Sequence, residues 1–171
     1  MSEGTTIQNF YSAAQKKEFA RDFQFRVTSL GPYAPDDLLY IKTATLPGMT
    51  LQNQTVPYMG LDFNVPGSVK YDGSDSWEVT FWCDEALNIR NKAEGWLREI
   101  FNDATSTGKY GVPVEQATMN LLGKNLETIR TFTFYGIYLV TLGAIEYNKT
   151  GTGEPLEFNA TLAYQFWREG V

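Results

Sequence analysis

Histidine is absent from this 171-residue sequence, and cysteine occurs once, at Cys83. Without imidazole there is no Ser-His-Asp triad and no histidine metal ligand. A single thiol forms neither an internal disulfide nor a thiolate zinc cluster. Its position in the alternating stretch WEVTFWCDE instead predicts a cysteine packed in the core or sheet. The sequence therefore predicts no catalytic residue, no cofactor and no metal site.

The sequence also lacks long apolar runs and an excess of basic residues. No stretch approaches the ~20 residues of a membrane span, and the first residues, MSEGTTIQNFYSAAQKKEF, lack the apolar segment of a signal peptide. We therefore expect synthesis in a reducing cytoplasm. Lys and Arg total 14 against 20 Asp and Glu, a net charge of −6. This balance argues against ordinary nucleic-acid binding but is compatible with an acidic surface past which a polyanion slides.

Strand-forming patterns are abundant. Aromatic residues make up 15% of the chain, which is typical of a β-rich protein. In the clearest strand Trp77, Val79, Phe81 and Cys83 share one face, and Phe23, Phe25 and Val27 alternate in the same way in another. Strands are predicted at residues 23–30, 38–46, 50–66, 68–71, 76–84, 128–143 and 156–167.

One segment changes to a helical period. Apolar residues from Ala86 to Ile100 form one stripe of an amphipathic helix at about 85–102, with Asp84 placed to cap it and Glu94–Arg98 as a favourable pair. Residues 1–20 are predicted as a polar arm or short helix. Residues 103–127 are predicted as a long surface loop, in which 114–122 form at most a helical turn.

These elements predict a single domain, 1–171, that is mainly β. We expect two packed antiparallel sheets in a sandwich or barrel, the flanking helix, and an extended β-hairpin at about 50–66. That hairpin is unusual because its apolar residues are spaced among Thr, Gln and Asn. Open strand edges pair readily with other chains, and a homo-oligomeric ring uses this property. We therefore expect the hairpin to hold copies of the chain together.

Recognisable chemical motifs are few. Gly151-Thr152-Gly153 is too short for a dinucleotide-binding loop, and the spacing of Asp72 and Asp75 favours a turn over a calcium loop. Trp82 and Trp167 are candidates for stacking on sugar rings, although packing in the core or an interface is favoured.

Five stretches in order resemble the tail tube protein of T4-like contractile-tailed bacteriophages: FARDFQFRV, IKTATLPG, VPYMGLDFNVPG, WEVTFWCDEA with its helix, and GAIEYN followed by EFNATLAYQFW. The resemblance runs from about Phe19 to Trp167 and is interrupted mainly at 103–127. The most telling stretches are Lys42–Pro47 and Trp77–Ala86. Neither is catalytic, so the specificity comes from order and coverage.

The resemblance implies a structural subunit rather than an enzyme. Homohexameric rings would stack into a hollow virion tail tube whose partners are the sheath protein, the baseplate tube-initiator and the tape-measure protein, with DNA later passing through the lumen without specific binding. The helix would lie outside the barrel, and the N-terminal arm and the 103–127 loop would help ring stacking or face the sheath. Glu78 is a candidate for facing the lumen. The candidate contact residues between subunits or rings are Thr50, Gln52, Gln54, Val56, Tyr58, Leu61, Phe63 and Val65.

Three alternatives remain open. The chain could build the tube of a phage-like injection or secretion system, or be the baseplate protein that initiates a tube. A monomeric carbohydrate-binding β-sandwich is the alternative from a different class, and it predicts an exposed aromatic platform without self-assembly.

Overall fold

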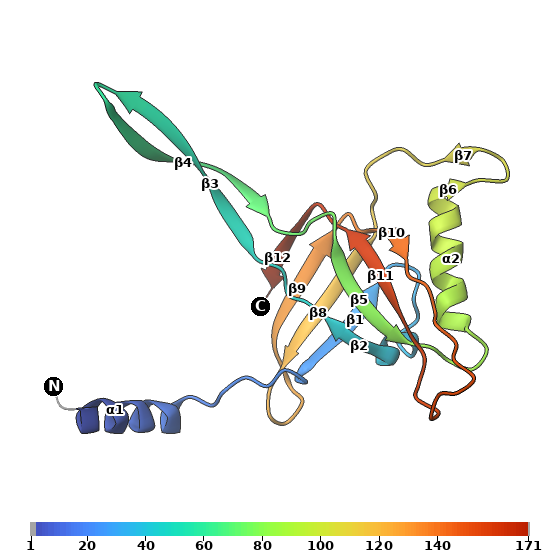
Figure 1. Cartoon of the computed structure of the whole chain (residues 1–171), viewed down its shortest axis with the longest axis horizontal. Coiled ribbons are helices and arrows are strands. Elements are labelled where there is room, and N and C mark those ends of the chain that lie inside the picture. The colour runs from blue at the N-terminus through green and yellow to red at the C-terminus, as the bar shows by residue number, and fades with distance from the viewer. Residues whose placement is uncertain (1–2, 171) are drawn as a thin grey trace.

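The computed structural model describes residues 3–170, in which two four-stranded antiparallel sheets pack into a β-sandwich with a flanking helix (Figure 1). No sheet closes into a barrel within this part of the chain. The first sheet has the order β1 (Phe25–Leu30), β8 (Gln116–Leu122), β9 (Thr128–Tyr135) and β12 (Phe166–Gly170). The second sheet has the order β10 (Tyr138–Leu142), β11 (Glu157–Ala163), β5 (Trp77–Trp82) and β2 (Ile41–Ala44).

Aromatic stacking between the sheets forms the core. Trp77 of the second sheet stacks on Phe134 of the first, with ring centroids 4.5 Å apart. Within the second sheet Phe81 stacks on Phe158 at 5.3 Å. The predicted alternation of β5 is confirmed, since its odd-numbered residues are buried and Glu78 is exposed. Such aromatic pairs add ~0.5–1.5 kcal/mol each beyond the burial of their area.

Of two further predictions for residues near these strands, one is wrong and one is confirmed. Phe23 does not face the core: it is 72% exposed, because the amide of Gln24 closes a turn onto the carbonyl of Arg21 and β1 begins only at Phe25. Cys83 is half-buried against the core, as predicted, and its amide donates to the carbonyl of Leu156.

The sequence predicts two C-terminal strands, but each of these segments contributes to two strands in the structure. Residues 128–143 form β9 and β10, and 156–167 contribute to β11 and β12, so the chain crosses from one sheet to the other within each segment. Gly136 makes the first crossing possible with φ of +66°, and an added Cβ there would lie 2.6 Å from Gln165. The sequence pattern remains strand-like throughout because both sides of each bend enter the same core.

Helix α2 (Asn88–Ile100) begins three residues later than predicted. Asp84 accepts hydrogen bonds from the amides of Asn88 and Ile89 at 3.1 and 3.2 Å, which confirms its capping role. The predicted Glu94–Arg98 ion pair is present at 3.2 Å. The helix buries one stripe, consisting of Ile89, Ala93 and Trp96.

The predicted loop at 103–127 is wrong in its second half. After the short strands β6 (Phe101–Asn102) and β7 (Thr107–Gly108), residues Gln116–Leu122 form β8, which lies between β1 and β9 and is no helical turn. The stretch QATMNLL lacks β-branched and aromatic side chains apart from one threonine, so its strand conformation follows from pairing on both sides rather than from propensity.

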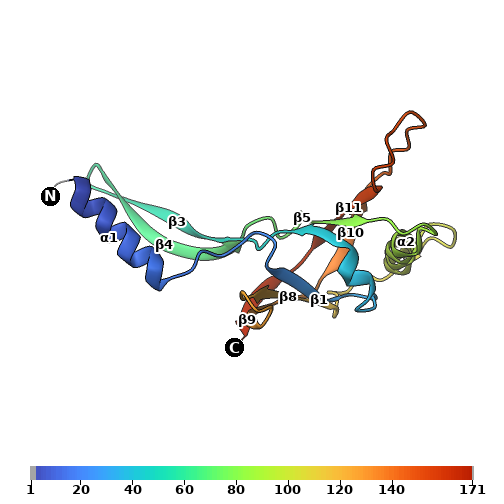
Figure 2. The same cartoon turned by 90° about the horizontal axis from the view of Figure 1, so that it is seen from below.

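Two elements project from the sandwich on the same side (Figures 1 and 2). One is helix α1 (Glu3–Lys16), which forms most of the predicted N-terminal arm; residues 17–20 are not helical, and residues 1–2 lie outside the described part. The other is the hairpin of β3 (Met49–Tyr58) and β4 (Leu61–Tyr71), which extends the predicted 50–66 at both ends. The turn η1 (Asp37–Tyr40) leads into β2.

Candidate assembly surfaces

The β3-β4 hairpin is long, regular and exposed. Its strands meet in a two-residue turn in which Met59 and Gly60 have φ of +49° and +82°. Positive φ at both positions is the signature of a type I′ turn, whose twist matches that of paired strands. Every residue of β3 is exposed, and in β4 only Gly67 and Tyr71 are half-buried. The hairpin therefore presents both of its faces to solvent in the isolated chain.

The outer half of the hairpin has one apolar face. Paired residues in an antiparallel ladder lie on the same face, and the register pairs Gln54 with Val65, Val56 with Phe63, and Tyr58 with Leu61. The five apolar residues of this set are 43–65% exposed. We call Gln54, Val56, Tyr58, Leu61, Phe63 and Val65 the distal face.

A β-bulge moves the apolar side chains to the other face in the inner half. Leu51 pairs with Val69 but Asn53 pairs with Pro66, so Gln52 faces two residues of β4 and the alternation of β4 shifts by one. Gly67 lies at the bulge, where an added Cβ would lie 2.6 Å from the carbonyl oxygen of Gln52. The resulting proximal face consists of Met49, Leu51, Val69 and Tyr71.

The eight contact residues predicted from sequence all lie on the side of the distal face, but they divide into two groups. Val56, Tyr58, Leu61, Phe63 and Val65, with Gln54, form the distal face itself. Thr50 and Gln52 lie further in, among polar partners: the Thr50 hydroxyl contacts the Asp72 carboxylate at 2.8 Å, and Ser68 donates to Gln52 at 3.2 Å.

Sequence reasoning missed the proximal face. A strict alternation assigns Val69 and Tyr71 to the side of Leu61 and Phe63, because all four have odd numbers. The extra residue at Gly67 reverses that assignment. A glycine within a strand pattern was the available signal, since glycine inside a strand often marks a bulge.

The base of the hairpin is fixed to the sandwich. The Tyr164 hydroxyl donates to the carbonyl of Asp72 at 3.0 Å, and burial raises the pKa of this phenol. Tyr71 packs edge-on against Trp167, with ring centroids 6.1 Å apart. Trp167 also contacts Phe132 at 5.8 Å, so it serves as a packing residue rather than an exposed platform. These contacts set the direction in which the hairpin leaves the body.

The four strands at the sheet edges are a second candidate surface. β1 and β12 border the first sheet, and β10 and β2 border the second. Within residues 3–170 no further strand pairs with their outer sides. An edge strand carries unpaired N–H and C=O groups that can extend the sheet into a neighbouring molecule.

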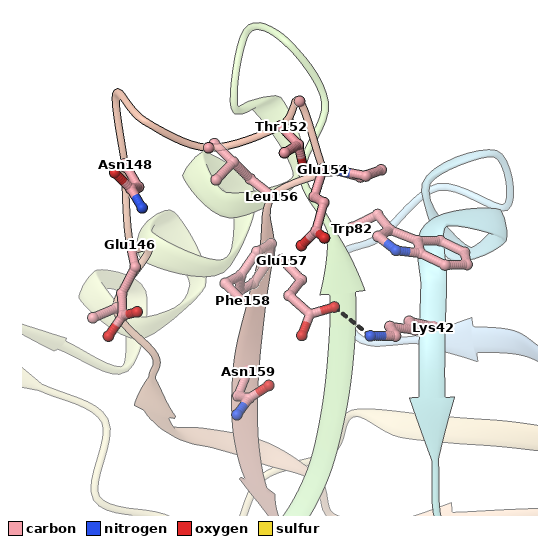
Figure 3. Close-up of a pocket in the computed structure, with 14 residues that line it drawn as sticks. Lys42, Trp82, Glu146, Asn148, Thr152, Glu154, Leu156, Glu157, Phe158 and Asn159 are labelled. Carbon is pink, nitrogen blue, oxygen red and sulfur yellow. Dashed lines mark hydrogen bonds and ion pairs between the residues drawn. The ribbon is translucent and has the colours of Figure 1, made fainter.

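The solvent-facing sides of the two sheets carry different charge. Glu78 is exposed on β5, and further along the same side of this sheet Lys42 pairs with Glu157 at 2.5 Å (Figure 3). The first sheet instead exposes Arg26 on β1 and Arg168 on β12. The second sheet is therefore the more acidic of the two.

An open groove runs beside β5, under the segment that joins β10 to β11 (Figure 3). Trp82, 39% exposed, borders it together with the Lys42–Glu157 pair. The segment contributes Glu146 and Glu154. Of its two aromatic lining residues only Trp82 is exposed, because Phe158 is 1% exposed, so the two rings form no platform for stacking on a sugar.

The described residues show little that resembles a reactive centre. Among residues 3–170 no group of three Cys, Asp or Glu side chains converges as metal ligands. Burial raises the pKa of the Cys83 thiol, and the neighbouring Asp84 adds to this, so the thiolate is disfavoured. In the same part of the chain no helix has the length and apolar character needed to cross a bilayer.

The sequence matches no protein-family model and no curated protein sequence. The fold, however, matches solved chains. One, from the six-fold symmetrised baseplate of the anti-feeding prophage, has 15% identity and a TM-score of 0.65, covering 90% of this chain and 97% of that chain.

Two further matches come from related assemblies. A chain of the PVC sheath-tube complex, an extracellular contractile injection system in its extended state, has 13% identity and a TM-score of 0.63, covering 93% of this chain and 96% of that one. A chain of the tube-terminating cap of the anti-feeding prophage has 14% identity and a TM-score of 0.64, with coverages of 90% and 92%. The tube-type fold expected from the sequence resemblance is therefore confirmed.

Proposed function

We propose that this chain is the repeating subunit of the tube of a contractile phage tail or a phage-like injection system. Hexameric rings of it stack into a hollow conduit. The observation that carries the proposal is the β3-β4 hairpin, which projects from the body with an apolar distal face and no cover within residues 3–170. Large apolar patches on a soluble protein mark interaction sites.

The fold supports a homomeric partner. The similar chains belong to a baseplate, a sheath-tube complex and a tube cap, and the first of these assemblies is six-fold symmetrised. Each four-stranded sheet of this chain has two open edges, so a sheet can continue from one subunit into the next. Rings closed in this way leave no free edge, which removes the aggregation hazard of open strands.

We assign the second sheet to the lumen, with Glu78 facing inward. The reason is charge: phosphates are repelled by exposed carboxylates, whereas Arg26 and Arg168 of the first sheet would bind them. DNA then passes through the tube without specific binding. The further partners are the sheath protein outside, the tape-measure protein inside, and a baseplate tube-initiator at one end.

The test is direct observation of assembly. The purified protein is passed through size-exclusion chromatography with light scattering, and the same fractions are imaged by negative-stain electron microscopy. We expect six-fold rings or hollow tubes, either spontaneously or after addition of a tail-initiation complex. A protein that remains monomeric under both conditions contradicts the proposal and favours a binding module, for which the groove beside Trp82 would be the first place to search.

A further inference from the structure

We propose, resting on the proposed function, that helix α1 of one copy packs against the distal face of the hairpin of a second copy. Both surfaces are apolar and exposed in the isolated chain, and both project from the same side of the sandwich (Figure 2). The contact is head-to-tail, because one copy supplies the helix and the other supplies the hairpin face.

Helix α1 has an apolar stripe. Ile7, Phe10, Tyr11 and Ala14 follow the i, i+3, i+4, i+7 spacing that places side chains on one side of a helix. The first three are 65–69% exposed. A detached helix of 14 residues is marginal in water without a surface to pack on. The apolar stripe therefore needs a surface to pack on that helix α1 itself does not supply.

The distal face fits this stripe in length and charge. The stripe from Ile7 to Ala14 spans ~12 Å along the helix, and residues 54–58 and 61–65, which hold the distal face, each span ~17 Å. Neither surface carries a charge: the charged residues of α1, Glu3 and Lys16, lie at its two ends, and Asp62 lies on the opposite face of the hairpin. The distal face is long enough to cover the stripe, and two neutral apolar surfaces can be joined without burying an unpaired charge.

The arrangement within one chain favours a second copy over the chain's own hairpin. Helix α1 and the hairpin leave the body along separate directions (Figure 1). The connection after α1 is held beside the β8–β9 turn, where Lys124 contacts Glu18 at 3.1 Å, and Phe19 contacts Phe10 with ring centroids 6.5 Å apart. The helix is thus held away from the hairpin above it.

The experiment uses two full-length variants, Phe10→Glu on α1 and Phe63→Glu on the distal face. Each alone should weaken self-association at least ~30-fold, the effect of losing an interface hot spot. Mixed together they should associate more strongly than either variant alone, in complexes that contain both, because Phe10→Glu retains an intact hairpin and Phe63→Glu retains an intact helix. Sedimentation velocity and native mass spectrometry measure both results.

Matched controls lie one residue away on the opposite faces: Asn9→Glu on α1 and Asn64→Glu on β4. These should assemble as the unmodified protein does. Circular dichroism checks that each variant keeps its fold, and both phenylalanines are exposed, so the sandwich core is not disturbed.

The outcomes separate the inference from the proposed function. A mixture that stays monomeric overturns the inference, as does unimpaired assembly of either phenylalanine variant. If such a variant forms rings or tubes as readily as the unmodified chain, the inference fails and the proposed function stands. If the unmodified chain forms only head-to-tail oligomers that depend on Phe10 and Phe63, the inference stands and the tube proposal fails.

Discussion

Tyr33 shows how a single polar group is accommodated in the aromatic core. Its ring stacks on Phe81 with centroids 5.3 Å apart, and its hydroxyl donates to the carbonyl of Ile89 at 3.0 Å, which ties the turn after β1 to helix α2. Burial, and secondarily the nearby Asp37 carboxylate, raises the pKa of this phenol well above its ordinary value of 10.0. The neutral, donating form is therefore the one that the fold requires.

Replacing Tyr33 by Phe should make stability depend on pH in a defined way. At pH 8 the variant loses the hydrogen bond and should be ~1 kcal/mol less stable. Above pH ~10 the unfolded wild type releases the phenolic proton while the folded protein keeps it, so wild-type stability falls by up to ~1.4 kcal/mol per pH unit. The variant lacks this loss, and the difference should close by about pH 11.

Urea unfolding of both proteins at pH 8 and pH 11 measures the effect. Tyr110→Phe is the matched control, because that side chain is 86% exposed, and it should change neither curve. If the free energies of unfolding of wild type and Tyr33→Phe differ more at pH 11 than at pH 8, the raised pKa of Tyr33 is contradicted.

Among the secondary-structure elements, the hairpin owes its two apolar faces to the bulge at Gly67. The bulge can be removed by either of two mutations, which have different consequences. Deleting Gly67 leaves each neighbouring side chain on its present face, because Ser68 then follows Pro66 in regular alternation. Inserting one residue between Gln52 and Asn53 gives Gly67 a partner and turns the whole distal face to the side of Leu51.

The insertion should abolish assembly, and the deletion should retain it with altered strength, since only the local bend is lost. Light scattering on the two proteins, with thermal unfolding as a check on the sandwich, tests this. Assembly of the insertion variant at the wild-type level would show that the orientation of the distal face is immaterial.

Some of these elements could be predicted from the sequence and others could not. Alternation in β5, the stripe of α2 and the existence of the hairpin were predictable, because each depends on neighbours within a few residues. Strand β8 was not, since its conformation depends on β1 and β9, which lie far away in the chain. The crossing at Gly136 was also hidden, because residues on both sides of it are equally apolar.

At the scale of the whole molecule, the net charge of −6 is unevenly distributed over the two sheets. If the second sheet lines the lumen, reversing Glu78 should convert a repelling surface into a retaining one. Tubes of Glu78→Lys should hold a fluorescent DNA oligonucleotide that wild-type tubes release, and raising the salt concentration should free it.

Co-sedimentation of oligonucleotide with tubes is the measurement. Glu115→Lys changes the net charge equally, and this exposed residue lies directly before β8 of the first sheet. Equal retention by the two variants would mean that net charge, rather than an inward position of Glu78, controls passage.

The placement of α1 and the hairpin on one side of the sandwich gives the subunit a direction. Any assembly built by repeating a contact between these projections and the next copy has two chemically different ends. One end displays a helix α1 without a partner, and the other displays a distal face without an occupant. Growth therefore proceeds with unequal rates at the two ends, and a factor that blocks one end controls length without touching the other.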